Sequence, residues 1–221
     1  RIVRTTPGVP CEFRAISDRP CGFEQVCHDE GVECMRIEER SRARFSRAVA
    51  EHLADAGNVD ACLLFLDRLV GPELFARLPT FNIHPSLLPA FPGREGVAQA
   101  ARRGVRFLGA TLHLVDAGID TGPIIAQTIT PLAGGESASQ LEKFAYIQKV
   151  YLGLLLVDAL RCRAMRVSDD LRSAEIQDWH CVSDRASPAL RNPGFLAGIQ
   201  ALERREQTRV FCSTECPRCA S

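Results

Sequence analysis

Lysine is nearly absent from this chain of 221 residues, which contains 25 arginines but only Lys143 and Lys149. Basic and acidic residues balance at 27 each, so the chain lacks the net positive charge of a broad nucleic-acid-binding surface. No apolar run reaches the length of about 18 residues that a transmembrane helix needs, which excludes a membrane span. A basic segment followed by an apolar one is also missing, so we expect a cytoplasmic protein.

Cysteine, in contrast, occurs ten times. Because no secretion signal is present, we expect reduced thiols rather than a disulfide framework. The tightest cluster is Cys212, Cys216 and Cys219, and a zinc site there would need a fourth ligand such as Cys181 or His180. The spacing of this cluster is loose, and we predict that the chain binds no metal.

Short apolar segments alternate with helical patterns along most of the chain. Strands are predicted at residues 11–17, 32–37, 60–66, 80–83, 107–115 and 124–130, and helices at 21–30, 41–56, 72–77, 93–103 and 137–165. This alternation predicts an α/β fold with a mostly parallel sheet flanked by helices, and the segment 60–66 is apolar enough to be buried on both faces. We expect one domain over residues 1–167 and an irregular extension over 168–221, where the helical pattern weakens.

Two polar side chains stand at the end of one predicted strand. Asn82 and His84 are two residues apart, so they point to the same side of the strand, and Pro85 ends it. Open α/β sheets bind their ligands at the carboxyl ends of parallel strands. An amide there can donate to a developing oxyanion, and an imidazole can act as a general acid.

A loop rich in glycine and aspartate follows His113 and contains Asp116, Gly118 and Asp120. Its glycines allow a tight turn, which can bring a carboxylate such as Asp120 near the imidazole of His84 to orient it or to relay a proton. The chain has no Gly-x-Ser-x-Gly motif for a nucleophilic serine. The pattern therefore favours a direct acyl transfer between a carbonyl compound and an amine. The alternative is that Asn82 and His84 only cap a turn.

The two motifs together resemble a known family. The sequence from Asn82 to Gly93, Asn-Ile-His-Pro-Ser-Leu-Leu-Pro-Ala-Phe-Pro-Gly, and the segment from Gly109 to Ile125 are similar to the 10-formyltetrahydrofolate-dependent formyltransferases, most of all to those that act on glycinamide ribonucleotide. The resemblance covers residues 9–165 and implies a Rossmann-like formyltransferase fold. It also implies a transferase of purine biosynthesis that moves the formyl group of 10-formyltetrahydrofolate to an amine.

The resemblance also implies roles for individual residues. Asn82, His84 and Asp120 match the catalytic asparagine, histidine and aspartate of the family, and His113 matches a supporting histidine. The expected folate contacts are Arg68, Leu69, Val70, Leu114, Val115, Asp116 and Gly118, and the expected contacts to the ribonucleotide are Ile83 and Pro85. The implied partners are a folate and a small-molecule amine, with no nucleic acid and no membrane.

The chain departs from the family pattern in three places. First, we expect the opening strand of the family and its phosphate-binding loop to be missing before Cys11. Second, one folate-contacting segment lacks its glycine at Leu64–Leu66. Third, we expect the glutamate that binds the substrate to be absent from the stretch Ile147–Leu152. Three alternatives therefore stay open: formyl transfer to another amine such as an amino sugar, hydrolysis of formyltetrahydrofolate, and a non-catalytic relic of the fold.

Overall fold

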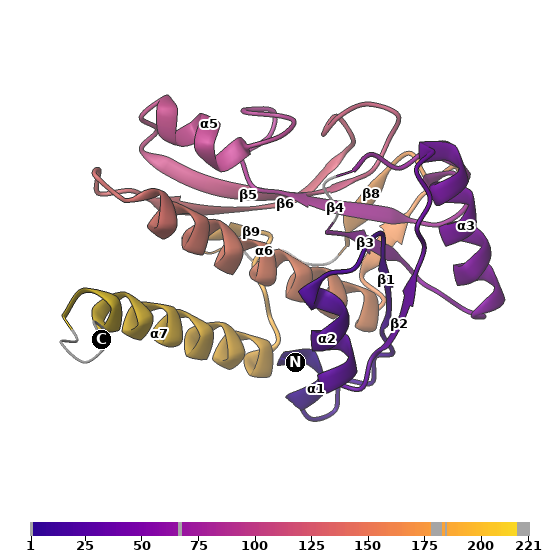
Figure 1. Ribbon diagram of the computed structural model, residues 1–221, viewed down its shortest axis with the longest axis horizontal. Coiled ribbons are helices and arrows are strands. Elements are labelled where there is room, and N and C mark those ends of the chain that lie inside the picture. The colour runs from indigo at the N-terminus through magenta and orange to yellow at the C-terminus, as the bar shows by residue number, and fades with distance from the viewer. Residues whose placement is uncertain (1, 66–67, 178–182, 184, 216–221) are drawn as a thin grey trace.

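The computed structural model describes residues 2–65, 68–177, 183 and 185–215, and its centre is a five-stranded sheet (Figure 1). The strand order is β3-β4-β5-β6-β9. The strands are β3 Cys62–Leu64, β4 Thr80–His84, β5 Phe107–Leu114, β6 Ile124–Pro131 and β9 Ala186–Ser187.

The direction of these strands corrects one prediction. Within this sheet β3 and β4 run parallel, whereas the pairs β4–β5, β5–β6 and β6–β9 are antiparallel. The sheet is therefore mixed, and the prediction of a mostly parallel sheet is wrong. The short loop 115–123 joins β5 to β6 directly, and such a connection produces an antiparallel pair, because a parallel pair needs a longer crossover. The predicted strand at residues 60–66 is also shorter than expected, and it is only half-buried because β3 lies at the sheet edge.

A long helix covers one face of this sheet. Helix α6 (Ala138–Arg161) lies along β5 and β6, and α7 (Pro193–Glu215) packs on its far side, so that sheet, α6 and α7 form successive layers (Figure 1). Ser137 caps the start of α6: its side chain accepts from the amide of Gln140, whose side chain accepts from the amide of Ser137. Leu152 and Leu155 of α6 are fully buried in the main core, which also contains Phe81 and Leu112 of the sheet.

The N-terminal part of the chain forms a smaller unit beside the sheet edge. Its elements are β1 Arg14–Ser17, α2 Gly22–Asp29, β2 Glu33–Arg36, α3 Arg42–Asp55 and α4 Pro72–Phe75. Helix α1 (Ile2–Thr5), which precedes them, contacts α7 and adds Val3 to the main core. Strands β1 and β2 pair in parallel as a sheet of their own. A second core holds this part together, in which Phe45, Val49 and Leu53 of α3 contact Val70 and Leu74. Strand β3 and helix α4 follow α3 in the chain and connect this second core to β4.

The C-terminal part is more ordered than predicted. Strand β7 (Met165–Val167) and β8 (Ala174–Ile176) form a hairpin, so the predicted boundary at residue 167 falls inside one supersecondary unit. Strand β9 extends the main sheet, and Phe195 and Ile199 of α7 are buried in the main core. The expectation of an irregular extension is therefore wrong, because this segment supplies apolar side chains that cover α6. None of the helices in the described part of the chain has the length and apolarity needed to span a bilayer.

Candidate active site

Four polar side chains converge at the end of β4. Asn82 and His84 point to the same face of that strand, and His113 on β5 stands directly opposite Asn82 in the antiparallel register. The loop after β5 returns Asp120 to the same place. The Asp120 carboxylate lies 3.3 Å from Asn82 Nδ2, 3.2 Å from His84 Nδ1 and 3.5 Å from His113 Nε2. The four residues form what we call the Asp120 cluster.

Asp120 is the centre of this cluster. Its Oδ2 also accepts a hydrogen bond of 2.7 Å from the backbone amide of Gly93, so the carboxylate joins β4, β5 and the loop 85–93. Burial raises the pKa of Asp120, but hydrogen bonds from His113 and Gly93 and the charges of His84 and His113 outweigh it, and the pKa lies below its ordinary value. Asp120 has a φ of 53°, a left-handed conformation that aspartate adopts more readily than most residues. The site therefore holds an ionised carboxylate beside two imidazoles.

His84 is held from both sides of its ring. Its Nε2 donates to the carbonyl of Phe91 at 2.7 Å, while its Nδ1 faces Asp120 Oδ2 at 3.2 Å. Both neighbours are oxygen acceptors, so a ring with a proton on each nitrogen satisfies both at once. The start of α5 (Gly96–Arg102) packs closely against it, because a Cβ on Gly96 would lie 3.1 Å from His84 Nε2. His84 is only 4% exposed, so a change of partner is needed before it can bind a substrate atom.

His113 and Asn82 complete the cluster through a second set of bonds. His113 Nδ1 donates to the carbonyl of Leu114 at 2.9 Å. Its Nε2 lies 3.2 Å from Asn82 Nδ2 and 3.5 Å from Asp120 Oδ1, so it accepts from the amide in the neutral ring and donates to the carboxylate in the protonated ring. Asn82 Nδ2 thus directs one hydrogen toward His113 and the other toward Asp120. Asn82 is the less buried of the two and is the member best placed to release a bond to a ligand.

The loop 85–93 is braced by residues that the sequence analysis did not single out. Ser86 Oγ donates to the carbonyl of Ala90, and Thr111 Oγ1 donates to the carbonyl of Ser86 and accepts from the amide of Leu88. These bonds position the carbonyl of Phe91 and the amide of Gly93, the two backbone groups that hold His84 and Asp120. The carbonyl of Phe91 and the amide of Gly93 both belong to the motif that ends at Gly93. They hold His84 and Asp120 through backbone atoms, which residue types alone do not reveal.

The loop predicted to contact the folate through Leu114, Val115, Asp116 and Gly118 is shaped largely by its own contacts. Asp116 Oδ1 accepts from the amide of Gly118 and from Thr121 Oγ1, at 3.0 and 2.8 Å. A Cβ on Gly118 would lie 2.0 Å from Thr121 Oγ1, so a larger residue there would displace the Thr121 side chain from Asp116. Leu114 is 1% exposed in the main core, and the amide of Val115 donates to the carbonyl of Thr80. A ligand contact from Leu114 would have to involve its backbone, whereas the side chain of Val115 is half-buried.

The other predicted folate segment, Arg68, Leu69 and Val70, also faces largely inward. The Arg68 guanidinium donates to the carbonyls of Glu39 and Arg40, and it stacks over the ring of Phe45 at 4.0 Å. Val70 is 3% exposed in the second core, and its carbonyl accepts from Arg42. Leu69, at 48% exposure, is the residue of this segment whose side chain is open to a ligand.

The two residues predicted to contact the ribonucleotide differ in exposure. Ile83 is 3% exposed and lies in the main core beneath α6, on the opposite face of β4 from Asn82 and His84, whereas Pro85 is half-buried. Within the stretch predicted to lack the substrate glutamate, Gln148 is buried and donates to the carbonyl of Leu108 and to Thr130 Oγ1. The Gln148 side chain therefore links α6 to the sheet.

The prediction that the chain binds no metal concerns residues inside and outside the described part of the chain. Among the described residues, no group of three or more His, Cys, Asp or Glu side chains is placed to hold an ion. His180, Cys181, Cys216 and Cys219 lie outside the described residues, as does the side chain of Cys212.

Comparison with known proteins agrees with the resemblance. The family described as formyl transferase matches residues 16–149 of this chain. A phosphoribosylglycinamide formyltransferase of Mycobacterium tuberculosis is 44% identical over 102 residues, covering 45% of this chain and 47% of that protein. A protein of the same name from Bacillus subtilis is 41% identical over 105 residues, covering 47% and 54%. The chain thus spans about half the length of these curated relatives.

A solved structure is similar over a larger part of the chain. The crystal structure of glycinamide ribonucleotide transformylase 1 from Symbiobacterium toebii has 35% sequence identity and a TM-score of 0.63, and the match covers 74% of this chain and 79% of that one. This likeness confirms the α/β class and the Rossmann-like formyltransferase fold that the two motifs predict. Residues 16–149, which the formyl transferase family matches, contain the whole of β4 and β5 and the loop that carries Asp120. The chain belongs to the formyl transferase family.

Proposed function

We propose that this protein transfers a formyl group from 10-formyltetrahydrofolate to the amine of glycinamide ribonucleotide, a reaction of purine biosynthesis. The observation that carries the proposal is the Asp120 cluster, in which one carboxylate contacts an amide and two imidazoles. Membership of the formyl transferase family and the names of the relatives support the choice of donor and acceptor. Both substrates are small molecules on this proposal, and a cytoplasmic location stays a prediction.

The cluster offers the groups that a direct transfer needs. As the amine nitrogen bonds to the formyl carbon, the carbonyl electrons move to oxygen, and Asn82 Nδ2 would donate to the resulting oxyanion after releasing its long bond to Asp120. Asp120 would accept a proton from the attacking nitrogen, directly or through water, which leaves it neutral.

Collapse of the tetrahedral intermediate then breaks the bond between the formyl carbon and the folate nitrogen. That nitrogen must gain a proton as it leaves, and His84, with Asp120 beside Nδ1, would supply it. The products are the formamide and tetrahydrofolate. None of the four side chains is a serine or cysteine, which favours transfer without an acyl-enzyme.

The surface near the cluster offers apolar side chains on which the flat ring system of a folate would pack. Ile124 is the register partner of His113 on β6, and it is 46% exposed, while Ile119 in the neighbouring loop is 51% exposed. Exposed aliphatic side chains beside a polar cluster are typical of small-molecule sites, where a few polar groups fix orientation. Leu69 and the backbone of residues 114–118 are the further contacts that we propose for the folate.

The proposal is tested by incubating the purified chain with 10-formyltetrahydrofolate and glycinamide ribonucleotide. Tetrahydrofolate is followed by absorbance, and formylated amine and formate are followed by mass spectrometry. Formylated amine in equal amount to tetrahydrofolate supports the proposal. Formate without formylated amine would assign hydrolysis, and formylated amino sugar alone would assign another acceptor. A folded chain that consumes no donor with any acceptor would indicate the relic.

A further inference from the structure

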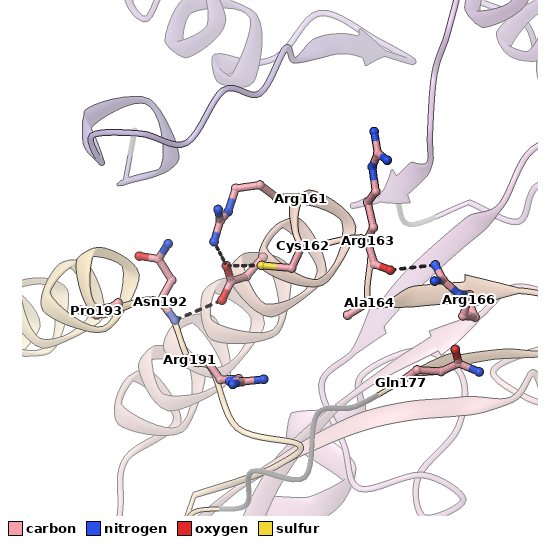
Figure 2. A pocket seen from close by; sticks show the side chains of 10 residues that line it. Arg161, Cys162, Arg163, Ala164, Arg166, Gln177, Arg191, Asn192 and Pro193 are labelled. Atoms are coloured by element: carbon pink, nitrogen blue, oxygen red, sulfur yellow. Dashed lines mark hydrogen bonds and ion pairs between the residues drawn. The ribbon is translucent and has the colours of Figure 1, made fainter.

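A second polar cavity lies at the C-terminal end of α6 and shares no residue with the Asp120 cluster. It has a volume of about 430 Å³ and lies where the end of α6, the turn into β7, the end of β8 and the start of α7 meet (Figure 2). Its lining consists of Asp158, Arg161, Cys162, Arg163, Ala164, Arg166, Gln177, Arg191, Asn192 and Pro193. Nothing in the proposed formyl transfer uses these residues.

The lining of this cavity is strongly basic, with four arginines and one aspartate. Asp158 offsets one of these positive charges through its ion pair with Arg161, and it is 1% exposed with both of its oxygens occupied. Its Oδ1 accepts from Arg161 Nη2 at 2.9 Å, and its Oδ2 accepts from the backbone amide of Asn192 at 3.0 Å. Asp158 therefore acts as a buried brace between α6 and α7, and three formal positive charges remain in excess around the cavity.

Counted over the described residues, two of the arginines each make one hydrogen bond, which leaves most of their donors for a ligand. Arg161 is held by Asp158, and Arg166 Nη1 donates to the carbonyl of Arg163 at 2.7 Å. A guanidinium has five N–H donors in a planar fork that matches phosphate oxygens. Figure 2 shows Arg191 extending from the segment before α7 toward the side of Gln177, whereas the Arg163 side chain points away from Arg166 and Arg191.

The start of α7 adds a second source of positive potential at the same place. Asn192 and Pro193 line the cavity where α7 begins, and Asn192 caps this end because its side chain accepts from the amide of Phe195. The amino end of a helix carries partial positive charge and favours anions. The arginine forks and the helix start are independent features, and both favour a negatively charged ligand.

We propose that this cavity binds a small anion that carries two or more phosphate groups, held by Arg161, Arg166 and Arg191. Arginine is the side chain best suited to phosphate because its fork can form two parallel charge-assisted bonds. The volume lies in the range of small-molecule sites and exceeds what a single phosphate fills. Free pyrophosphate and a nucleoside diphosphate share this chemistry, and both are used as probes.

The test is a calorimetric titration of the purified chain at low salt with inorganic pyrophosphate and, separately, with ADP. Saturable binding with a one-to-one stoichiometry is expected for at least one probe. Arg166→Gln and Arg191→Gln should each weaken it about tenfold or more, and Arg166→Lys should weaken it less because it keeps the charge but loses the fork. The matched control is Arg172→Gln, whose side chain is 86% exposed and lies outside the lining, and it should bind as the unaltered chain does.

Thermal unfolding of each variant verifies that the chain is folded during the titration. Tighter binding of ADP than of pyrophosphate would identify a nucleotide site, and equal or weaker binding of ADP would identify a site for the phosphates alone. The proposal is overturned if the folded chain shows no saturable binding of either probe at millimolar concentration. It is also overturned if Arg172→Gln weakens binding as much as Arg166→Gln, since the effect would then follow overall charge.

Discussion

Replacing Asp120 with asparagine removes one negative charge and leaves the size of the side chain unchanged. The carboxylate has four neighbours, and all of them are donors or can become donors: Asn82 Nδ2, His84 Nδ1, His113 Nε2 and the amide of Gly93. An asparagine amide group would face the Gly93 amide in one orientation and the Asn82 amide in the other. Either orientation places two donors against each other in a site where Asp120 is only 12% exposed.

The cost of this change follows from the bonds that it weakens. A hydrogen bond to a charged group contributes about 1.5–3 kcal/mol to the free energy of unfolding. Loss of one such bond should lower the melting temperature by about 2–4 °C for each kcal/mol in a chain of this size. If Asp120 accepts the proton of the attacking amine, the rate of formyl transfer should fall by about 10²–10⁴-fold.

The loss of stability should depend on pH in a defined direction. The pKa of Asp120 is lower in the folded protein than its ordinary value, so the carboxylate stabilises the fold above the unfolded-state pKa of about 4. This contribution disappears as the pH falls through the lower folded-state pKa. The difference in stability between the unaltered chain and Asp120→Asn should therefore be largest near neutral pH and should shrink below about pH 4.

The assay combines urea unfolding across this pH range with initial rates of transfer. Asp55→Asn is the matched control, because Asp55 is an exposed carboxylate at the end of α3 and should change neither quantity. A rate for Asp120→Asn within about twofold of the unaltered chain would refute the proton-accepting role. A stability difference that stays constant from neutral to acid pH would refute the electrostatic reasoning.

Three further predictions concern the structure that supports the site. Gly122→Ala should abolish transfer and lower the free energy of unfolding in urea by at least about 1–3 kcal/mol, because a Cβ at this position would lie 1.8 Å from the carbonyl oxygen of Leu114. Gly22→Ala is the control and should be tolerated, because a Cβ there would have nothing within 4 Å. Ser137→Ala should lower stability by about 1 kcal/mol, measured in the same way, through loss of the cap of α6. Phe195→Ala should cost about 3–5 kcal/mol, since that ring is fully buried, and unchanged stability would contradict the inclusion of α7 in the main core.

The position of the polar cluster could be anticipated largely from local pattern. Alternation along a strand is enough to place Asn82 and His84 on one face, and Pro85 marks the end of that strand. The cap at Ser137 and the apolar spacing of α6 depend on neighbours within one or two turns, so they could also be predicted. The glycine-rich loop suggested that a carboxylate such as Asp120 returns to His84, and the family resemblance singled out Asp120 as the catalytic one.

The missed features depend on contacts between distant segments. Strand direction was wrong because the prediction followed the alternation of apolar segments and helices and did not use the short loop between β5 and β6, which favours an antiparallel pair. The groups that hold His84 and Asp120 were missed because they are the carbonyl of Phe91 and the amide of Gly93, and every residue has such groups. The order of the C-terminal part was missed because Phe195 and Ile199 form a core only once α6 is present to contact them.

By itself, therefore, the sequence determined the α/β class, the family and the identity of the polar side chains at the end of β4, since these follow from residue type and short-range spacing. Only the tertiary structure decided the mixed direction of the sheet, the partners of each imidazole nitrogen and the gathering of Arg161, Arg166 and Arg191 around one cavity. These arise when chain segments far apart in the sequence pack together, because burial and hydrogen bonding depend on which groups meet in space.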